Sequence, residues 1–241
     1  FTGRANSALA VGDPGLPLGD ALDRVERWYA TRELPPRVAV PWPLSVRRAT
    51  TTGDERPGGP GIDTDLDHEL ARRGYRLQTP TLVLTASARE VRVATTPMAA
   101  EGAASGRASD LHLHLADEPD DAWLAVYHYR GQQLPSVARR LLMSAPSQVF
   151  ASVRDSDGRA VAVARAASAR GWTGVTAMEV DPSHRRRGLA RRVLAEIAAW
   201  ALERGDPSLY LQVAESNAAA RALYESAGFA PHHGYHYRVR D

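Results

Sequence analysis

The stretch HRRRGLARR, residues 184–192, constrains the fold of this chain more than any other part of its sequence. It follows residues 173–180, which read as a β-strand. It leads into residues 188–204, where Leu189, Val193 and Ile197 recur at helical spacing before Gly205. A strand, a short basic loop and a helix form the repeating unit of α/β folds. The sequence therefore predicts an α/β protein with such a unit here.

The predicted helix start is suited to binding an anion. The amides of a first helical turn have no intrahelical partner, and the helix dipole adds partial positive charge there. Gly188 and Ala190 let a ligand approach the backbone closely, and the arginines at 185–187, 191 and 192 supply charge for phosphates. We interpret the loop as a pyrophosphate site. The alternatives are a solvated helix face and a basic patch for nucleic acid.

The charge balance of the whole chain weakens the nucleic-acid alternative. The sequence has 30 basic residues, every one of them arginine, against 28 acidic residues, which leaves a net charge of +2. Proteins that bind nucleic acid usually carry a large, clustered basic excess, so no nucleic-acid partner is expected. The chain has no cysteine, which removes disulfides, thiolate zinc ligands and cysteine nucleophiles.

The histidines do not indicate a metal site. His112 and His114 share one face of a predicted strand, and His232, His233 and His236 cluster near the end of the chain. Because no carboxylate accompanies them at matching spacing, we expect no metal. We expect these histidines to line an acceptor site or to be exposed.

The sequence shows neither a membrane span of about 18 apolar residues nor the pattern of a secretion signal. We therefore expect a cytoplasmic protein with no membrane partner. Because the chain opens at Phe1 within a strand-like run, we also expect it to be part of a longer chain.

Two segments of small and polar residues interrupt the chain. Residues 50–65 read as a mobile loop, and residues 95–110 read as an interdomain linker. After the linker the predicted order is β-α-α-β-β-β-α-β-α-β, which makes an α/β sandwich around a mixed sheet. These elements occupy residues 111–115, 120–130, 134–144, 149–154, 160–166, 173–180, 188–204, 209–213, 217–227 and 229–239.

The N-terminal part repeats this order of strands and helices in a degenerate form. Strand-like runs at 8–11 and 37–40 enclose a helix containing RVERWYATREL. The loop between the first run and the helix has no arginine, and Pro17 in it has no amide to donate. Asp20 at the helix start repels an anion and can cap the helix. We therefore expect residues 1–94 to form a partial, structural domain without an anion site, and residues 111–241 to form the active domain.

Two motifs in residues 111–241 resemble those of the GNAT superfamily of acyl-CoA-dependent N-acyltransferases. The first is VDPSHRRRGLA at 180–190, where the family has Arg or Gln, two residues, Gly, one residue, and Gly or Ala after a strand. The second is Asn217 followed by Ala220, Leu223-Tyr224 and Gly228-Phe229. The resemblance covers residues 111–239 and implies a GNAT-type mixed central sheet flanked by helices. With the degenerate N-terminal half, the arrangement is similar to that of tandem-domain members.

The resemblance implies direct acetyl transfer from acetyl-CoA to a primary amine. Amides of the loop would hold the pyrophosphate, and main-chain groups of the preceding strand would hold the pantetheine arm and the thioester. The residues expected to bind acetyl-CoA are Met178, Val180, Arg185, Arg186, Arg187, Gly188, Leu189, Ala190, Asn217 and Tyr224.

The resemblance also assigns the two proton transfers that acyl transfer needs. Tyr224 matches the family position that protonates the leaving thiolate. Glu179, on the strand beside the thioester, is the first candidate for the base, and Glu215 is the second. Three alternatives stay open: Tyr224 could fill the core, Glu179 could be an ion-pair partner, and Asn217 could cap its helix.

Alternatives also remain for the class of the acceptor and for whether the chain is an enzyme. We expect the amine of a small molecule, with a protein or peptide amine as the alternative, and the resemblance also allows a homodimer. Residues 120–144 and the last strands are expected to select the acceptor. A second hypothesis is an acyl-CoA-binding module without turnover, and a third is a nucleic-acid binder.

Overall fold

The computed structural model describes residues 6–43, 64–96, 111–128, 134 and 137–241. These residues form two compact units. The first unit contains the described residues up to Val83 together with 213–218 and 231–241. The second unit contains the described residues of 84–212 together with 219–230.

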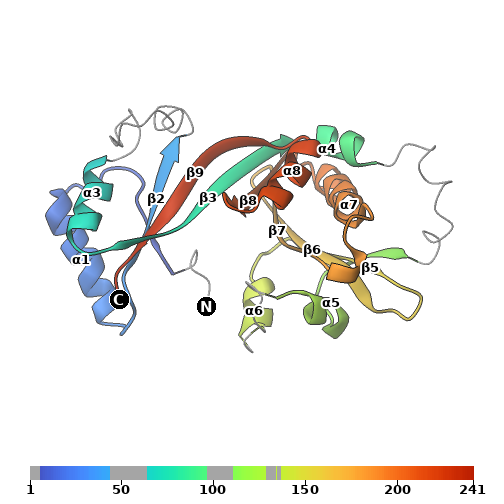
Figure 1. Cartoon of the computed structure of the whole chain (residues 1–241), viewed down its shortest axis with the longest axis horizontal. Helices are drawn as coiled ribbons and strands as arrows, with labels where there is room; N and C mark the ends of the chain where they lie inside the picture. Colours follow the sequence, from blue (N-terminus) through green and yellow to red (C-terminus); the bar gives the residue numbers. More distant parts are fainter. Residues whose placement is uncertain (1–5, 44–63, 97–110, 129–133, 135–136) are drawn as a thin grey trace. The chain divides into compact units, whose positions relative to one another are not determined.

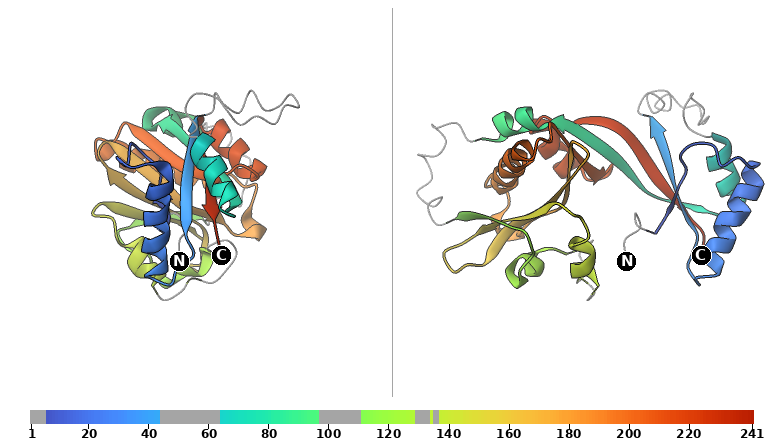
Figure 2. Two further views of the ribbon diagram at one scale, coloured as in Figure 1. Left: turned by 90° about the vertical axis from the view of Figure 1, so that its left-hand side faces the viewer. Right: turned by 180° about the vertical axis from the view of Figure 1, so that it is seen from behind.

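The first unit combines a small sheet with two helices. Its strands stand in the order β1-β2-β9-β3, with β1 parallel to β2 and β2 antiparallel to β9. Helices α1 and α3 lie on one side of β2 (Figure 2), and their apolar faces enclose a core that includes Leu22, Val40 and Leu70. The elements are β1 (Ala8–Leu9), α1 (Leu18–Ala30), β2 (Arg37–Pro43), α3 (Thr64–Arg72), β3 (Arg76–Ser87) and β9 (Ala230–Val239), of which β3 and β9 also contribute residues to the second unit.

The second unit has a larger sheet with the strand order β8-β7-β6-β5-β4. The pairs from β4 to β7 are antiparallel, and β7 pairs with β8 in parallel. The strands are β4 (His112–Ala116), β5 (Gln148–Arg154), β6 (Ala160–Ala169), β7 (Trp172–Val180) and β8 (Ser208–Ala214). The helices are α4 (Ala88–Thr95), α5 (Asp121–Val126), α6 (Ala138–Leu142), the short 3-10 helix η2 (Pro182–His184), α7 (Leu189–Glu203) and α8 (Ala218–Ser226).

Helices cover both faces of this larger sheet. Figure 1 places α7 on one face of β5, β6 and β7, and α5 and α6 on the other. On the α5 face, the indole N–H of Trp123 is buried and donates to the carbonyls of Ala151 and Ala164 at 3.1 and 3.3 Å. Because this donor bridges β5 and β6, it fixes α5 to the sheet.

The predicted helices on the α5 face are shorter in the structure. Helix α5 begins after its cap, Asp120, but ends at Val126, since Tyr127 is already extended. Helix α6 covers only Ala138–Leu142 of the predicted 134–144. The predicted mobile loop and linker lie outside the described residues, apart from Thr64 and Asp65, which begin α3, and Thr95 and Thr96, which end α4.

The two units do not follow the predicted boundary at residues 95–110. Strand β9 lies within the predicted active domain of 111–241, yet it pairs with β2 from Arg37↔Val239 to Pro43↔His233 in the first unit. Helix α4 belongs to the second unit and contacts α7 there. That residues 1–94 are a degenerate sister domain stays a prediction.

A charged cluster ties α3 to β9 in the first unit. Asp67 accepts hydrogen bonds from Nε and Nη2 of Arg238 and lies 2.7 Å from Nε2 of His236, with only 15% of its side chain exposed. Burial raises the pKa of Asp67, but the hydrogen bonds from Arg238 and His236 outweigh burial and hold the pKa well below its usual range. Stability from this carboxylate is therefore present above its unfolded pKa and is lost as the pH falls.

We expect Asp67→Asn to lower the free energy of unfolding by about 3 kcal/mol at pH 7, because it leaves Arg238 partly buried without its carboxylate. The difference from the wild type should shrink as the pH falls below about 4. Urea unfolding between pH 7 and pH 3 measures both effects, with Asp65→Asn on the exposed side of α3 as the control. A difference that stays constant over this range would contradict the assignment.

Candidate functional site

The candidate site begins where β7 and β8 part. Their parallel pairing runs from Trp172↔Ser208 to Val175↔Leu211 and ends there, although β7 continues to Val180. Thr176, Glu179 and Val180 still pair with β6 on their other side. Within the described residues, this half of β7 therefore has one edge without a paired strand, which leaves main-chain groups available to a ligand.

A β-bulge interrupts the same half of β7. The register with β6 shifts between Val163, which faces Glu179, and Arg165, which faces Thr176, and Ala177 has a positive φ of 54°. An extra residue in one strand bends the strand and re-aims the side chains that follow. The bulge therefore determines the directions in which the side chains of Met178 and Glu179 project. The alternation of residues along the sequence does not reveal this bulge.

The loop after β7 is held by Asp181. Its carboxylate accepts a hydrogen bond from the Ser183 amide at 2.9 Å and caps η2. Hydrogen bonds from Ser183 and then His184 lower the pKa of Asp181 to about 2. Nε of Arg185 donates to the carbonyl of Val180 at 3.2 Å. The end of β7 and the loop are thus tied together by local contacts.

The backbone of this loop is left-handed at two positions just before α7. Arg186 has φ 63° and Gly188, the residue before α7, has φ 74°. No side chain caps the helix, and the amides of Gly188, Leu189 and Ala190 donate no hydrogen bond within the described part of the chain. Alternation of left-handed and ordinary backbone next to a helix start is a known anion-binding geometry. The predicted pyrophosphate loop therefore has the local structure that an anion requires.

The five arginines around this loop fall into two groups. Arg185, Arg186 and Arg187 are exposed. Arg191 instead donates to Ser226 and to the carbonyl of Ala94, and Arg192 donates to the carbonyl of Leu111 at 2.9 Å. Both guanidinium groups thus hold neighbouring segments of the second unit together. That Arg191 and Arg192 also add charge for phosphates stays a prediction.

Tyr224 is buried on α8, with 8% of its surface exposed. Its ring meets that of Phe229 edge to face at a centroid distance of 5.9 Å. Burial raises the pKa of Tyr224 to about 12, so its hydroxyl keeps its proton at neutral pH. The side chain fills the core and also has the protonation state that an acid needs. Asn217, which precedes α8, is exposed.

Glu179 is held by the end of α5. One of its carboxylate oxygens accepts a hydrogen bond from the backbone amide of His128 at 2.8 Å, and the other lies 3.7 Å from Nδ1 of the same histidine. Because Nδ1 lies 2.8 Å from the carbonyl of Val126, it carries the proton, and in the neutral ring Nε2 is left as an acceptor. The sequence did not identify His128, since only the fold brings it to Glu179.

The α5 face of β7 also carries aromatic side chains. The ring of Tyr210 covers Gly174, and a Cβ added to Gly174 would meet the ring atoms at 2.6 Å. Trp172 lies edge to face with Tyr210 at 6.4 Å between ring centroids. Both aromatic residues are partly exposed, at 42% and 37%. Glycine at 174 is therefore needed for this placement of Tyr210.

Most of these histidines are placed as expected, and His236 is the exception. His112 and His114 are exposed on β4, and His232 and His233 lie with Nδ1 atoms 2.9 Å apart. His236 is buried against Asp67, so the expectation of an exposed or acceptor-lining residue is wrong there. Among the described residues no group of three or more potential ligands could hold a metal.

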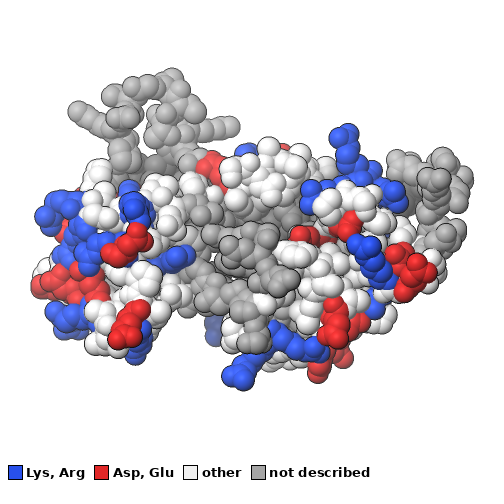
Figure 3. Space-filling view, turned by 60° about the horizontal axis from the view of Figure 1, so that its bottom comes forward, with Lys and Arg blue, Asp and Glu red and all other residues white. Residues whose placement is uncertain are grey.

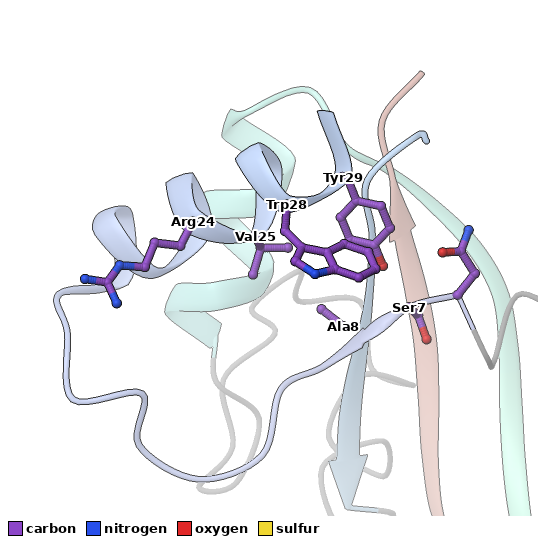
Figure 4. Close-up of a pocket in the computed structure, with 7 residues that line it drawn as sticks. Ser7, Ala8, Arg24, Val25, Trp28 and Tyr29 are labelled. Atoms are coloured by element: carbon purple, nitrogen blue, oxygen red, sulfur yellow. The ribbon is translucent and has the colours of Figure 1, made fainter. Parts of the chain in front are cut away.

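A separate pocket of about 380 Å³ lies in the first unit (Figure 4). Trp28 and Tyr29 of α1 face Ser7 and Ala8 across it, and Arg24 is its charged residue. None of the predicted site residues lines this pocket. Among the described residues, no helix is long and apolar enough to cross a membrane.

Comparisons with known proteins agree with the predicted fold class. A family model described as Probable histone acetyltransferase Rv0428c C-terminal matches residues 69–238. A tandem GNAT protein from the clavulanic acid biosynthesis pathway superposes with a TM-score of 0.65 at 12% identity, over 97% of this chain and 75% of that chain. At this identity the likeness shows the fold, and the predicted mixed sheet flanked by helices is confirmed.

Two curated relatives match over different extents. Probable histone acetyltransferase Rv0428c of Mycobacterium tuberculosis is 28% identical over 243 residues, which cover 96% of this chain and 64% of that protein. The [ribosomal protein bS18]-alanine N-acetyltransferase of Escherichia coli is 50% identical over 50 residues, 21% of this chain and 34% of that protein. The chain thus spans less than two thirds of the length of either relative.

We expect Gly174→Ala to destabilise the protein by about 2 kcal/mol, because the added methyl group would overlap the ring of Tyr210. Thermal unfolding measures the change. The double variant Gly174→Ala/Tyr210→Ser removes the ring and should recover most of the loss. Equal destabilisation in the single and double variants would show that the ring is not what requires glycine.

Proposed function

This chain belongs to the family described as Probable histone acetyltransferase Rv0428c C-terminal, and from that premise we propose that it is an acetyl-CoA-dependent N-acetyltransferase. The observation that carries the proposal is the start of α7, where the amides of Gly188, Leu189 and Ala190 have no partner within the described chain. These amides suit the pyrophosphate of CoA, and Arg185, Arg186 and Arg187 supply charge beside them.

The half of β7 that is not paired with β8 suits the pantetheine arm of the cosubstrate. Main-chain groups of Met178 and Val180 lie on the part of β7 that β8 no longer pairs with. A pantetheine arm carries amide groups, which can hydrogen bond to a free strand edge as another strand would. We assign Asn217 to this same binding region because it occupies the corresponding position of the second GNAT motif.

The reaction joins the acceptor nitrogen to the acetyl carbon and breaks the carbon–sulfur bond. We assign Tyr224 as the acid for the departing thiolate, which the proton retained on its hydroxyl supports. We assign Glu179 as the group that receives the proton of the amine, directly or through water. Its contact with His128 links this proton acceptor to the end of α5, and Glu215 is the second candidate.

For the acceptor we propose a primary amine of a small molecule. A protein or peptide amine is the alternative, because the names of two relatives specify a histone and a ribosomal-protein alanine as their targets. Assays with matched sets of small amines and peptides distinguish these classes. A non-catalytic acyl-CoA-binding module would bind CoA and release no thiol with any amine.

The small net charge of +2 gives the nucleic-acid alternative little support. Arginine and acidic side chains are interspersed on the face seen in Figure 3. Retention on DNA with a steep dependence on salt would be required for that alternative.

We expect Gly188→Glu to abolish CoA binding, because the carboxylate would occupy and repel the position of the pyrophosphate. Gly205→Glu is the matched control, since Gly205 has a similar φ of 79°, lies past the other end of α7 and has nothing within 4 Å of an added Cβ. Calorimetric titration with CoA measures both variants. Loss of binding in both, or retention in both, would contradict the placement of the pyrophosphate.

We expect Tyr224→Phe to lower kcat by about a hundredfold while leaving CoA affinity nearly unchanged. The phenylalanine ring preserves packing against Phe229, so thermal stability should change little and a core role alone predicts full activity. Thiol release from acetyl-CoA measures the rate. A fully active Tyr224→Phe variant would rule out the acid role.

A further inference from the structure

We infer that Arg165 binds a carboxylate of the acceptor, so that the acceptor is a small amine that carries its own carboxylate. This inference rests on the proposed acetyl transfer and narrows its substrate class. It concerns the α5 face of the second unit, where Arg165, Glu179 and the aromatic pair Trp172 and Tyr210 share one side of the sheet.

The strand registers place these side chains on a common face. Arg165 pairs with Phe150 on β5 and with Thr176 on β7. Phe150 and Val163 belong to the core around Trp123, which marks the α5 face. Val163 pairs with Glu179, and directly paired residues project to the same side of a sheet. Arg165 and Glu179 therefore face the same side.

Among the described residues, the hydrogen-bond partners of the Arg165 guanidinium are neutral groups. Nε donates to the carbonyl of Leu142 at 2.7 Å, and Nη2 donates to Oε1 of Gln148 at 3.0 Å. Within the described part of the chain, no carboxylate lies within ion-pair distance of this guanidinium, and the segment 129–136 after α5 has no acidic residue in its sequence.

The positive charge of Arg165 therefore has no negative charge beside it among the described residues. Burial lowers the pKa of Arg165, and a partly buried cation is costly without an anion beside it. Two hydrogen bonds use only part of the five donors of a guanidinium. Arg165 is thus held in place by these two bonds and still has donors free to bind a carboxylate. Its planar guanidinium is well suited to that role.

The position of Arg165 relative to Glu179 matches an amine with a nearby carboxylate. Arg165 and Glu179 lie on neighbouring strands, about two residues apart along the sheet and on the same face. A cationic and an anionic side chain on one face of the sheet are complementary in charge to a zwitterion. The amine would be directed to Glu179, where it must lose a proton, and the carboxylate to Arg165.

The aromatic pair extends the same surface. Tyr210 lies over Gly174, two residues before Thr176 on β7, and Trp172 is two residues further. Both rings are partly exposed, and they offer an apolar wall for the body of the acceptor. The N-terminal amine of a protein has no carboxylate on the same residue. This surface therefore favours small molecules over protein N-termini.

The test uses acceptor pairs that differ only in the carboxylate: phenylalanine with phenylalaninamide, and 4-aminobutyrate with 4-aminobutanamide. Steady-state rates with acetyl-CoA are measured for the full chain, for Arg165→Gln, and for Arg140→Gln. Arg140 is an exposed arginine on α6, so its variant controls for loss of one positive charge near the site.

We expect the wild type to prefer an acid over its amide by about tenfold or more in kcat/KM, mainly through KM. Arg165→Gln should lose this preference while its kcat with the amides is retained, and Arg140→Gln should keep it. If Arg165 only anchors α6, the variant would alter acid and amide rates alike. Equal use of acid and amide by the wild type in both pairs would overturn the inference, whether or not Arg165→Gln folds.

Calorimetric titration of the wild type with the same four compounds in the presence of CoA separates this inference from the proposed function. Tighter binding of the acids without acetyl transfer to any amine would refute the enzymatic proposal and support the carboxylate site. Acetyl transfer without a preference for the acids in rate or binding would support the enzyme and refute the carboxylate site.

Discussion

The amides of Gly188, Leu189 and Ala190, which have no hydrogen-bond partner among the described residues, are the feature on which the proposed site depends. A helix start without a capping side chain leaves donors that water or an anion must satisfy. Here the left-handed conformations of Arg186 and Gly188 shape the backbone around those donors. Asp181 and Arg185 fix the loop to the end of β7. The proposed anion site and the unpaired edge of β7 are therefore joined by one short connection with its own local hydrogen bonds.

The chemistry is arranged along β7 from this connection. The early end of pairing with β8 frees a main-chain edge, and the bulge at Ala177 changes the presentation of the residues after it. Glu179 then meets the end of α5 through His128. The opposite face of the sheet is occupied by α7 (Figure 1). In the proposed function, the start of α7 would bind the cosubstrate and the α5 face would bind the acceptor.

The turn and the helix start at residues 188–190 were predictable from the sequence because their determinants are local. That this loop binds an anion stays a prediction. Gly188, Ala190 and the helical spacing after them specify both the turn and the helix. Strand β3 was not predicted, since Pro80 lies in its middle and proline normally argues against a central strand. The contact of His128 with Glu179 and the internal contacts of Arg191 and Arg192 depend on which segments the fold brings together. Periodicity within one segment carries no information about such partners.

The most direct test of the central claim is a backbone amide NMR titration of the full chain with CoA. We expect the largest shifts at Gly188, Leu189 and Ala190, with smaller shifts along residues 176–180. Saturable binding of CoA that leaves the amides of Gly188, Leu189 and Ala190 unchanged would contradict this claim.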